Sequence, residues 1–144
     1  MKKLFQNDFL LLSDYRERES QTLCDAGLFS GAYYLAGYAV ECAIKAAIAS
    51  QTEAGEFPDK NYINKIYTHD LETLLKSSIL EKEFKKDIGT NAELGANWNE
   101  VIPWSEQVRY ELNIDEPIAR MLLNACFSTP NGVVTWIKSK LNAR

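Results

Sequence analysis

Four side chains within one apolar segment have the types and the spacing for chemistry. Residues 29–52 form an alanine-rich stretch of helix length in which Glu41 and Lys45 are the only charged residues. At helical spacing they share one narrow face with Tyr34 and Tyr38, because steps of four, three and four residues return to nearly the same angle. We call Tyr34, Tyr38, Glu41 and Lys45 the polar stripe. A helix that is apolar nearly all round lies inside a bundle, so the polar stripe must meet a polar partner, a subunit interface or a ligand.

Two structural explanations compete with a functional one for the polar stripe. Glu41 and Lys45 are four residues apart, and such a pair stabilises a helix by about 0.2–0.5 kcal/mol without any further role. This pairing explains their spacing but not their apolar setting. Alternatively, the stripe could join two copies of the chain, with tyrosines and ion pairs crossing a two-fold axis.

The remaining candidate residues lie outside this segment. His69 is the only histidine and stands at the predicted start of a helix, where a hydrogen bond to a neighbouring helix or to water would explain it structurally. Arg109 and Tyr110 follow Trp104, which places a guanidinium beside two rings that could stack with it or with a base. Arg109 could equally tie a helix end to a carboxylate.

Other recognisable sites are absent from the sequence. Gly-rich phosphate loops, GxSxG elbows and HExxH zinc helices do not occur. One histidine is too few for a metal centre, and Cys24, Cys42 and Cys126 lie outside any CxxC spacing. We therefore predict neither a metal nor a cofactor, and we expect three buried free thiols in a reducing compartment.

Length and composition are typical of one soluble globular domain over residues 1–144, with 46% hydrophobic and 25% charged residues. The net charge of -4 gives no general attraction to nucleic acid, so any RNA contact must come from a local patch. Glu41 and Lys45 lie near the middle of the long apolar segment and make membrane insertion costly. Asp8 ends the N-terminal apolar run before it reaches signal-peptide length, so we expect a cytoplasmic protein.

The hydrophobic pattern predicts an all-α protein. No segment has the alternation or the turn chemistry that is typical of a sheet. The expected helices lie at about residues 7–26, 29–52, 68–79, 115–130 and 132–141, with one or two more within residues 80–104 and a long loop at residues 53–67.

Capping residues and breakers mark the expected helix ends. Gly27 ends the first helix, and the segment 80–104 is interrupted near Gly89 or Gly95 before Pro103 stops it. The predicted N-caps are Asn7 or Asp8, Ser30, Thr68 and Asp115. The predicted inner face of the helix after Asp115 consists of Ile118, Met121, Leu122 and Ala125.

Four segments, taken together in this order and spacing, resemble the HEPN-domain family. They are AYYLAGYAVECAIKAAI at 32–48, THDLETLL at 68–75, NWNEVIPWSEQVRY at 97–110 and GVVTWIK at 132–138. The resemblance covers most of the chain. It implies a compact bundle built around an up-and-down four-helix core with extra short helices, commonly dimeric. Such proteins are often encoded beside a minimal nucleotidyltransferase in bacterial or archaeal toxin–antitoxin or defence systems.

Many proteins of this family are metal-independent ribonucleases, and the resemblance places Arg109 at the arginine of their motif. That arginine is followed by a polar residue and, after a gap of four to six residues, by a histidine. Here Tyr110 follows Arg109, and the histidine positions hold Ile114, Asp115 and Glu116. RNA cleavage without a metal needs a base, an acid and a cation, of which arginine supplies only the cation.

Two functions of different classes follow. The first is a noncatalytic, dimeric binding module for a nucleotide, RNA or a partner protein such as a nucleotidyltransferase. The second is a metal-independent ribonuclease toxin in which His69, with help from Glu41 or Lys45, replaces the missing histidine beside Arg109. The residues expected to bind a ligand or partner are Tyr34, Tyr38, Glu41, Lys45, His69, Arg109 and Tyr110.

Overall fold

The computed structural model describes residues 3–52 and 59–144, and this part of the chain contains helices and no strand. The prediction of an all-α bundle is therefore confirmed for the described residues. The α-helices are α1 (Gln6–Asp25), α2 (Phe29–Ala49), α3 (Lys60–Ile66), α4 (Leu71–Lys76), α5 (Glu81–Thr90), α6 (Ala92–Val101), α7 (Glu116–Phe127) and α8 (Val133–Asn142), and η1 (Glu106–Tyr110) is a 3-10 helix.

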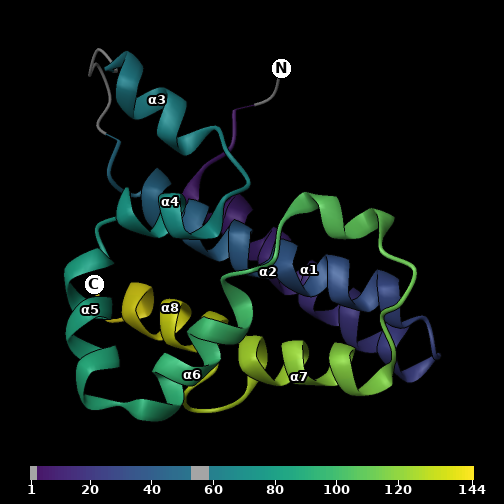
Figure 1. The fold of residues 1–144 in the computed structure, drawn as a ribbon. Coiled ribbons are helices and arrows are strands. Elements are labelled where there is room, and N and C mark those ends of the chain that lie inside the picture. Colours follow the sequence, from purple (N-terminus) through teal and green to yellow (C-terminus); the bar gives the residue numbers. More distant parts are fainter. Residues whose placement is uncertain (1–2, 53–58) are drawn as a thin grey trace.

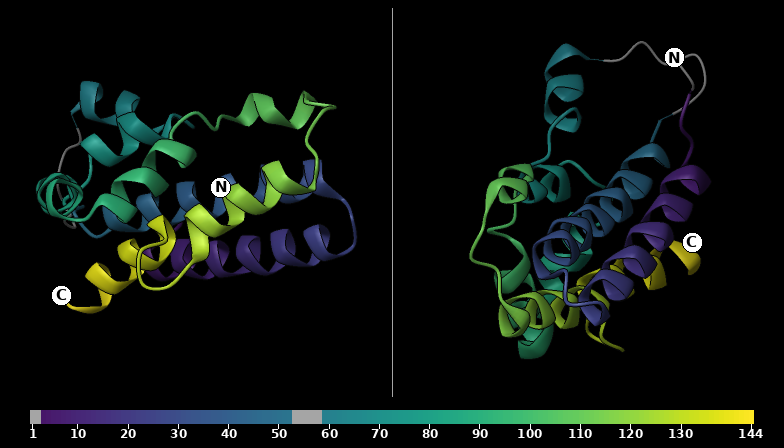
Figure 2. Two further views of the ribbon diagram at one scale, coloured as in Figure 1. Left: turned by 60° about the horizontal axis from the view of Figure 1, so that its bottom comes forward. Right: turned by 90° about the vertical axis from the view of Figure 1, so that its right-hand side faces the viewer.

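Helix α2 lies at the centre of the fold and contacts α1, α4, η1, α7 and α8. In Figure 1, α4 and η1 lie above α2, whereas α7 and α8 lie below it. Helix α1 runs beside α2 in the opposite direction, as both views of Figure 2 also show. The turn between these two helices uses Gly27 at φ 80°, a left-handed conformation that favours glycine, as the sequence predicts.

Small residues allow the neighbours of α2 to pack directly against its backbone. Gly37 is the extreme case, because a Cβ atom placed there would lie 2.0 Å from Cε2 of Trp104. The indole of Trp104 therefore occupies the volume that any other side chain would need. The alanines of α2 that are buried with this glycine are Ala32, Ala36, Ala39, Ala43, Ala46 and Ala47.

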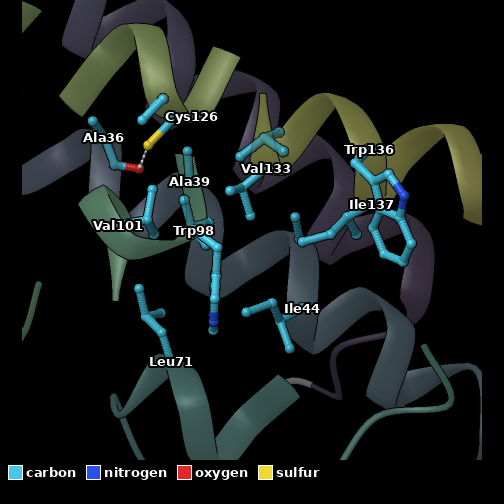
Figure 3. Packing of buried hydrophobic residues seen from close by; sticks show 14 of the residues in the cluster. Ala36, Ala39, Ile44, Leu71, Trp98, Val101, Cys126, Val133, Trp136 and Ile137 are labelled. Atoms are coloured by element: carbon cyan, nitrogen blue, oxygen red, sulfur yellow. Dashed lines mark hydrogen bonds between the residues drawn. The ribbon is translucent and has the colours of Figure 1, made fainter. Parts of the chain in front are cut away.

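The core continues from α2 to the C-terminal helices (Figure 3), where apolar side chains of α4, α6 and α8 converge on Ile44. The Cys126 thiol of α7 donates to the Ala36 carbonyl at 3.9 Å. Beyond them, Phe84 packs edge-to-face against Trp98 and Trp136, with ring centroids 5.2 and 5.0 Å apart. These aromatic contacts join α5, α6 and α8.

Three of the predicted N-caps are wrong and one is confirmed. The Asp115 carboxylate accepts from the Ile118 N–H at 3.1 Å at the start of α7, as predicted. Asp70 rather than Thr68 caps α4, because the Asp70 side chain can reach the Thr73 N–H. For α1 the N-cap is Phe5 rather than Asn7 or Asp8, and for α2 it is Leu28 rather than Ser30.

The helix boundaries also differ from the prediction in two regions. Residues 53–58 of the expected loop lie outside the described residues, but residues 60–66 form α3, capped by Asp59. The segment 80–104 is interrupted near Gly89, as predicted, although neither Gly89 nor Gly95 is itself the break. The break falls between them at Asn91, whose side chain accepts from the Leu94 N–H and starts α6.

Helix α7 is rotated relative to its predicted inner face. Leu122 and Ala125 are buried as expected, but Ile118 and Met121 are exposed. The buried face is completed instead by Ala119, Leu123 and Cys126, which point toward α1, α2 and α6. The small residues at 119 and 125 permit a closer approach than the bulkier pair would allow.

The cysteines and the long apolar helix behave as the sequence suggests. Cys24, Cys42 and Cys126 are all buried and free, which confirms that part of the prediction. Within the described ranges, no helix combines the length and the apolarity needed to cross a bilayer.

Replacing Gly37 with alanine tests the close approach of Trp104. The new methyl group must displace the indole, so we expect the free energy of unfolding to fall by about 2 kcal/mol or more, measured by urea denaturation. Gly89 in α5 is the matched control, since a Cβ there meets nothing within 4 Å. Gly89→Ala should raise stability by roughly 0.5–1 kcal/mol. Equal effects of the two substitutions would contradict this view of α2.

Asp87 gives the fold a defined response to acid. Its carboxylate accepts from Trp136 Nε1 at 2.8 Å and pairs with Lys140 at 3.3 Å, and these contacts, the first most strongly, hold the pKa of Asp87 below its ordinary value. Because the pKa of Asp87 is lower in the folded state, its charged form stabilises the protein at pH values above its ordinary pKa of 3.8. This contribution is lost as the pH falls from 3.8 through the pKa of the folded state.

We therefore expect the unfolding free energy of the unmodified protein to fall more steeply than that of Asp87→Asn as the pH drops from about 4 to 2. The asparagine keeps an oxygen that can accept from Trp136 but has no proton to take up. Urea denaturation at a series of pH values measures both slopes. Asp25→Asn, at an exposed carboxylate, should leave the slope of the unmodified protein unchanged. Identical slopes for the Asp87→Asn variant and the unmodified protein would rule out the effect.

Candidate functional site

The carboxylate of Glu41 is the centre of the polar stripe and is almost completely buried, with 3% of the residue exposed. Its Oε2 accepts from Lys45 Nζ at 3.1 Å, which is the expected pair along α2. Its Oε1 lies 2.7 Å from Nδ1 of His69, a residue of the segment between α3 and α4. Glu41 therefore does more than pair along its own helix, since it ties this segment to α2.

The orientation of the His69 imidazole follows from this contact. The Glu41 carboxylate faces the Lys45 ammonium group through Oε2 and accepts a hydrogen bond at Oε1 as well, so Nδ1 of His69 is the donor to Glu41. The other nitrogen, Nε2, is then left for a ligand or for water. The side chain is 44% exposed, so an outside group can reach it.

An aromatic cluster extends from His69 along α2. The ring of Tyr38 lies edge-to-face with the imidazole at 5.8 Å between centroids, with Tyr34 at 5.0 Å and with Trp104 at 5.1 Å. Burial and a hydrogen bond with Tyr34 raise the pKa of Tyr38. The Tyr38 hydroxyl therefore keeps its proton at neutral pH and can serve as a hydrogen-bond partner but not as a base.

Arg109 lies at the far end of this cluster. Its guanidinium stands 4.8 Å from the centroid of the Tyr110 ring, and hydrogen bonding to Tyr110 and then to Tyr34 raises the pKa of Arg109. Both Arg109 and Tyr110 are exposed. A permanently charged guanidinium is thus held at the surface beside Tyr34, at one end of η1.

Trp104 is missing from the predicted binding residues, although the sequence analysis considered its ring as a stacking partner for Arg109 or for a base. It is buried, packs against Tyr34 and Tyr38, and has an indole N–H without a hydrogen-bond partner among the described residues. The sequence signal for this contact is Gly37. It lies on the same face of α2 as Tyr34 and Glu41, and because it has no side chain it leaves a space between them. The sequence alone does not show which distant aromatic side chain fills that space.

The structure joins all seven predicted binding residues in one connected set. They form a chain of contacts from Arg109 and Tyr110 through Tyr34 and Tyr38 to His69, Glu41 and Lys45. Arg109 and His69, the two catalytic candidates, contact opposite ends of the tyrosine pair, Arg109 at Tyr34 and His69 at Tyr38.

Neither a metal ion nor a reactive thiol fits this site. No group of three or more histidine, cysteine, aspartate or glutamate side chains in the described part of the chain is arranged to hold a metal. Cys42 follows Glu41 directly, but burial raises the pKa of its thiol to about 11. It is therefore a thiol at neutral pH, which is a poor nucleophile.

Comparison with known proteins adds no further assignment, since no family model, curated protein or solved structure matches this chain.

Replacing Glu41 with glutamine tests whether the buried carboxylate holds the site together. The substitution keeps the shape but leaves Lys45 and His69 without their anionic partner, so we expect a loss of about 1–3 kcal/mol in urea denaturation. The matched control is Glu72→Gln, because Glu72 pairs with Lys76 at the same spacing on an exposed surface. That variant should change stability by less than about 0.5 kcal/mol. Similar small losses of stability in both variants would show that Glu41 and Lys45 form an ordinary pair along a helix.

Proposed function

We propose that this chain is a noncatalytic HEPN-type binding module of the cytoplasm. It acts as a dimer in a bacterial toxin–antitoxin or defence context and holds a nucleotide, RNA or a partner protein such as a minimal nucleotidyltransferase. The binding residues are those of the polar stripe together with His69, Arg109 and Tyr110.

The observation that carries this proposal is the continuous line of contacts from Arg109 to Lys45. Each side chain in the line is positioned by another, and Trp104 supports the two tyrosines from behind. Burying a carboxylate costs desolvation free energy, which its hydrogen-bond and ion-pair partners must offset. A buried glutamate on an otherwise apolar helix therefore favours a binding site over a side chain without a role.

The chemistry of the two ends suits a phosphate-bearing ligand. Arg109 provides an exposed guanidinium, which recognises phosphate oxygens well. Tyr110 offers an exposed ring on which a base can stack. His69 Nε2, at the other end, provides a single hydrogen bond whose direction Glu41 determines. A nucleotide or a short length of single-stranded RNA has groups for both ends.

Binding without cleavage is favoured because the groups needed for cleavage are apart. Arg109 has no histidine at the motif spacing, and His69 is separated from it by the rings of Tyr34 and Tyr38. Tyr38 lies between them but retains its proton. A base, an acid and a cation around one phosphate are what RNA cleavage requires.

Binding measurements with ATP and with a labelled single-stranded RNA test this function. We expect binding without degradation, and we expect Arg109→Ala to weaken it about ten-fold, the effect of losing one charge-assisted contact. Arg144→Ala is the control, because Arg144 pairs with Glu83 at the other end of the chain. Robust RNA cleavage that disappears in Arg109→Ala would overturn the noncatalytic assignment.

The His69–Glu41 pair supports a second candidate, the metal-independent ribonuclease toxin. A carboxylate that holds Nδ1 leaves Nε2 of this partly exposed imidazole for other partners, which is how a histidine is prepared for proton transfer. This alternative predicts RNA cleavage and growth arrest that are abolished in His69→Ala. Cleavage that continues in His69→Ala would exclude His69 as the base.

A further inference from the structure

A cavity of about 460 Å³ lies between α1 and α7, two helices that are in direct contact. Its volume is in the range of sites that hold small molecules in proteins. The lining side chains on the two helices are Gln21, Asp25, Arg120, Leu123, Asn124 and Phe127. None of them is among the seven residues of the candidate functional site, so a ligand here does not depend on the proposed function.

Opposite charges stand next to each other in the lining of this cavity. Nη2 of Arg120 lies 3.6 Å from Oδ1 of Asp25, which is longer than a hydrogen bond. Nε of Arg120 donates to Oε2 of Glu116 at 2.8 Å, and this contact holds the guanidinium in place. In the described part of the chain, the terminal nitrogens of Arg120 and the Asp25 carboxylate make no hydrogen bond. Both side chains are exposed and can therefore take further partners.

The rest of the lining combines amide and apolar groups. The side-chain amides of Gln21 and Asn124 have no hydrogen-bond partner among the described residues, although each can both donate and accept. Leu123 and Phe127 lie one turn apart on α7 and give the cavity an apolar part. One volume thus contains a cation, an anion, two free amides and an apolar surface.

We propose that this cavity binds a free α-amino acid with an apolar side chain. The terminal nitrogens of Arg120 suit the α-carboxylate, because a guanidinium binds a carboxylate through two parallel hydrogen bonds. The Asp25 carboxylate suits the α-ammonium group, and Leu123 and Phe127 suit the side chain. The two charges of an amino acid are joined through one carbon atom, which fits the neighbouring positions of Arg120 and Asp25.

The pair of opposite charges disfavours other small molecules. A simple anion that approaches Arg120 also meets the negative charge of Asp25, and a simple cation that approaches Asp25 also meets Arg120. An uncharged sugar could use the amides of Gln21 and Asn124, but it would leave both charges without a new partner. An internal segment of a peptide has neither the free ammonium nor the free carboxylate.

Isothermal titration calorimetry with L-phenylalanine tests the proposal. We expect L-phenylalanine to bind, and we expect N-acetyl-L-phenylalanine and L-phenylalanine amide, which each lack one charge, to bind about ten-fold more weakly. Arg120→Gln and Asp25→Asn should each weaken the binding of L-phenylalanine by about the same factor, since each removes one charge contact. Asn124→Trp, which fills the cavity from an exposed position, should abolish binding.

Arg18→Gln is the matched control, because Arg18 is an exposed arginine of α1 whose guanidinium lies over the Tyr15 ring and outside this cavity. It should leave the affinity unchanged, and all variants should keep the circular dichroism spectrum of the unmodified protein. Absence of L-phenylalanine binding at millimolar concentration, or unchanged affinity in Arg120→Gln, would overturn the proposal. Equal binding of N-acetyl-L-phenylalanine would also overturn it and would assign the cavity to anions. Arg120→Gln should bind ATP or RNA as the unmodified protein does, which keeps the two proposals separate.

Discussion

The structure depends on how closely its other elements approach the backbone of α2. Gly37 leaves no room for even one methyl group beneath the Trp104 indole, and the buried alanines give the same closeness along the rest of the helix. Trp104 in turn supports Tyr34 and Tyr38 from behind. The packing that makes the core dense is thus also the packing that orients the aromatic part of the candidate site.

Glu41 connects this core to the surface. Its carboxylate is buried, yet its two partners, Lys45 and His69, are partly exposed. A change at either partner therefore removes a hydrogen bond from the Glu41 carboxylate, and because this carboxylate is buried, water cannot replace that hydrogen bond. This arrangement links a surface imidazole to the central helix through one side chain.

Much of the fold could be predicted from local patterns, and most failures have one physical cause. The long helices and the Asp115 cap follow from periodicity and from a side chain that reaches its own backbone. The predicted cap of α4, Thr68, was wrong because the Asp70 side chain, two residues later, is the one that reaches the first turn of the helix. The exposure of Met121 depends on which face of α7 meets α1, α2 and α6, and that is a property of the tertiary structure. For the same reason, the sequence predicts the line of polar residues on α2 but does not predict that Trp104 packs against Tyr34 and Tyr38.

Because all three cysteines are buried, their reaction with an alkylating reagent can be used to measure how the helices separate. Cys24, Cys42 and Cys126 lie on α1, α2 and α7, and burial raises the pKa of the Cys42 and Cys126 thiols. An alkylating reagent can reach them only when those helices separate, and it then meets ordinary thiols. When reclosing is faster than alkylation, the rate at which each sulfur is labelled therefore gives the fraction of time that its helix is separated from the bundle.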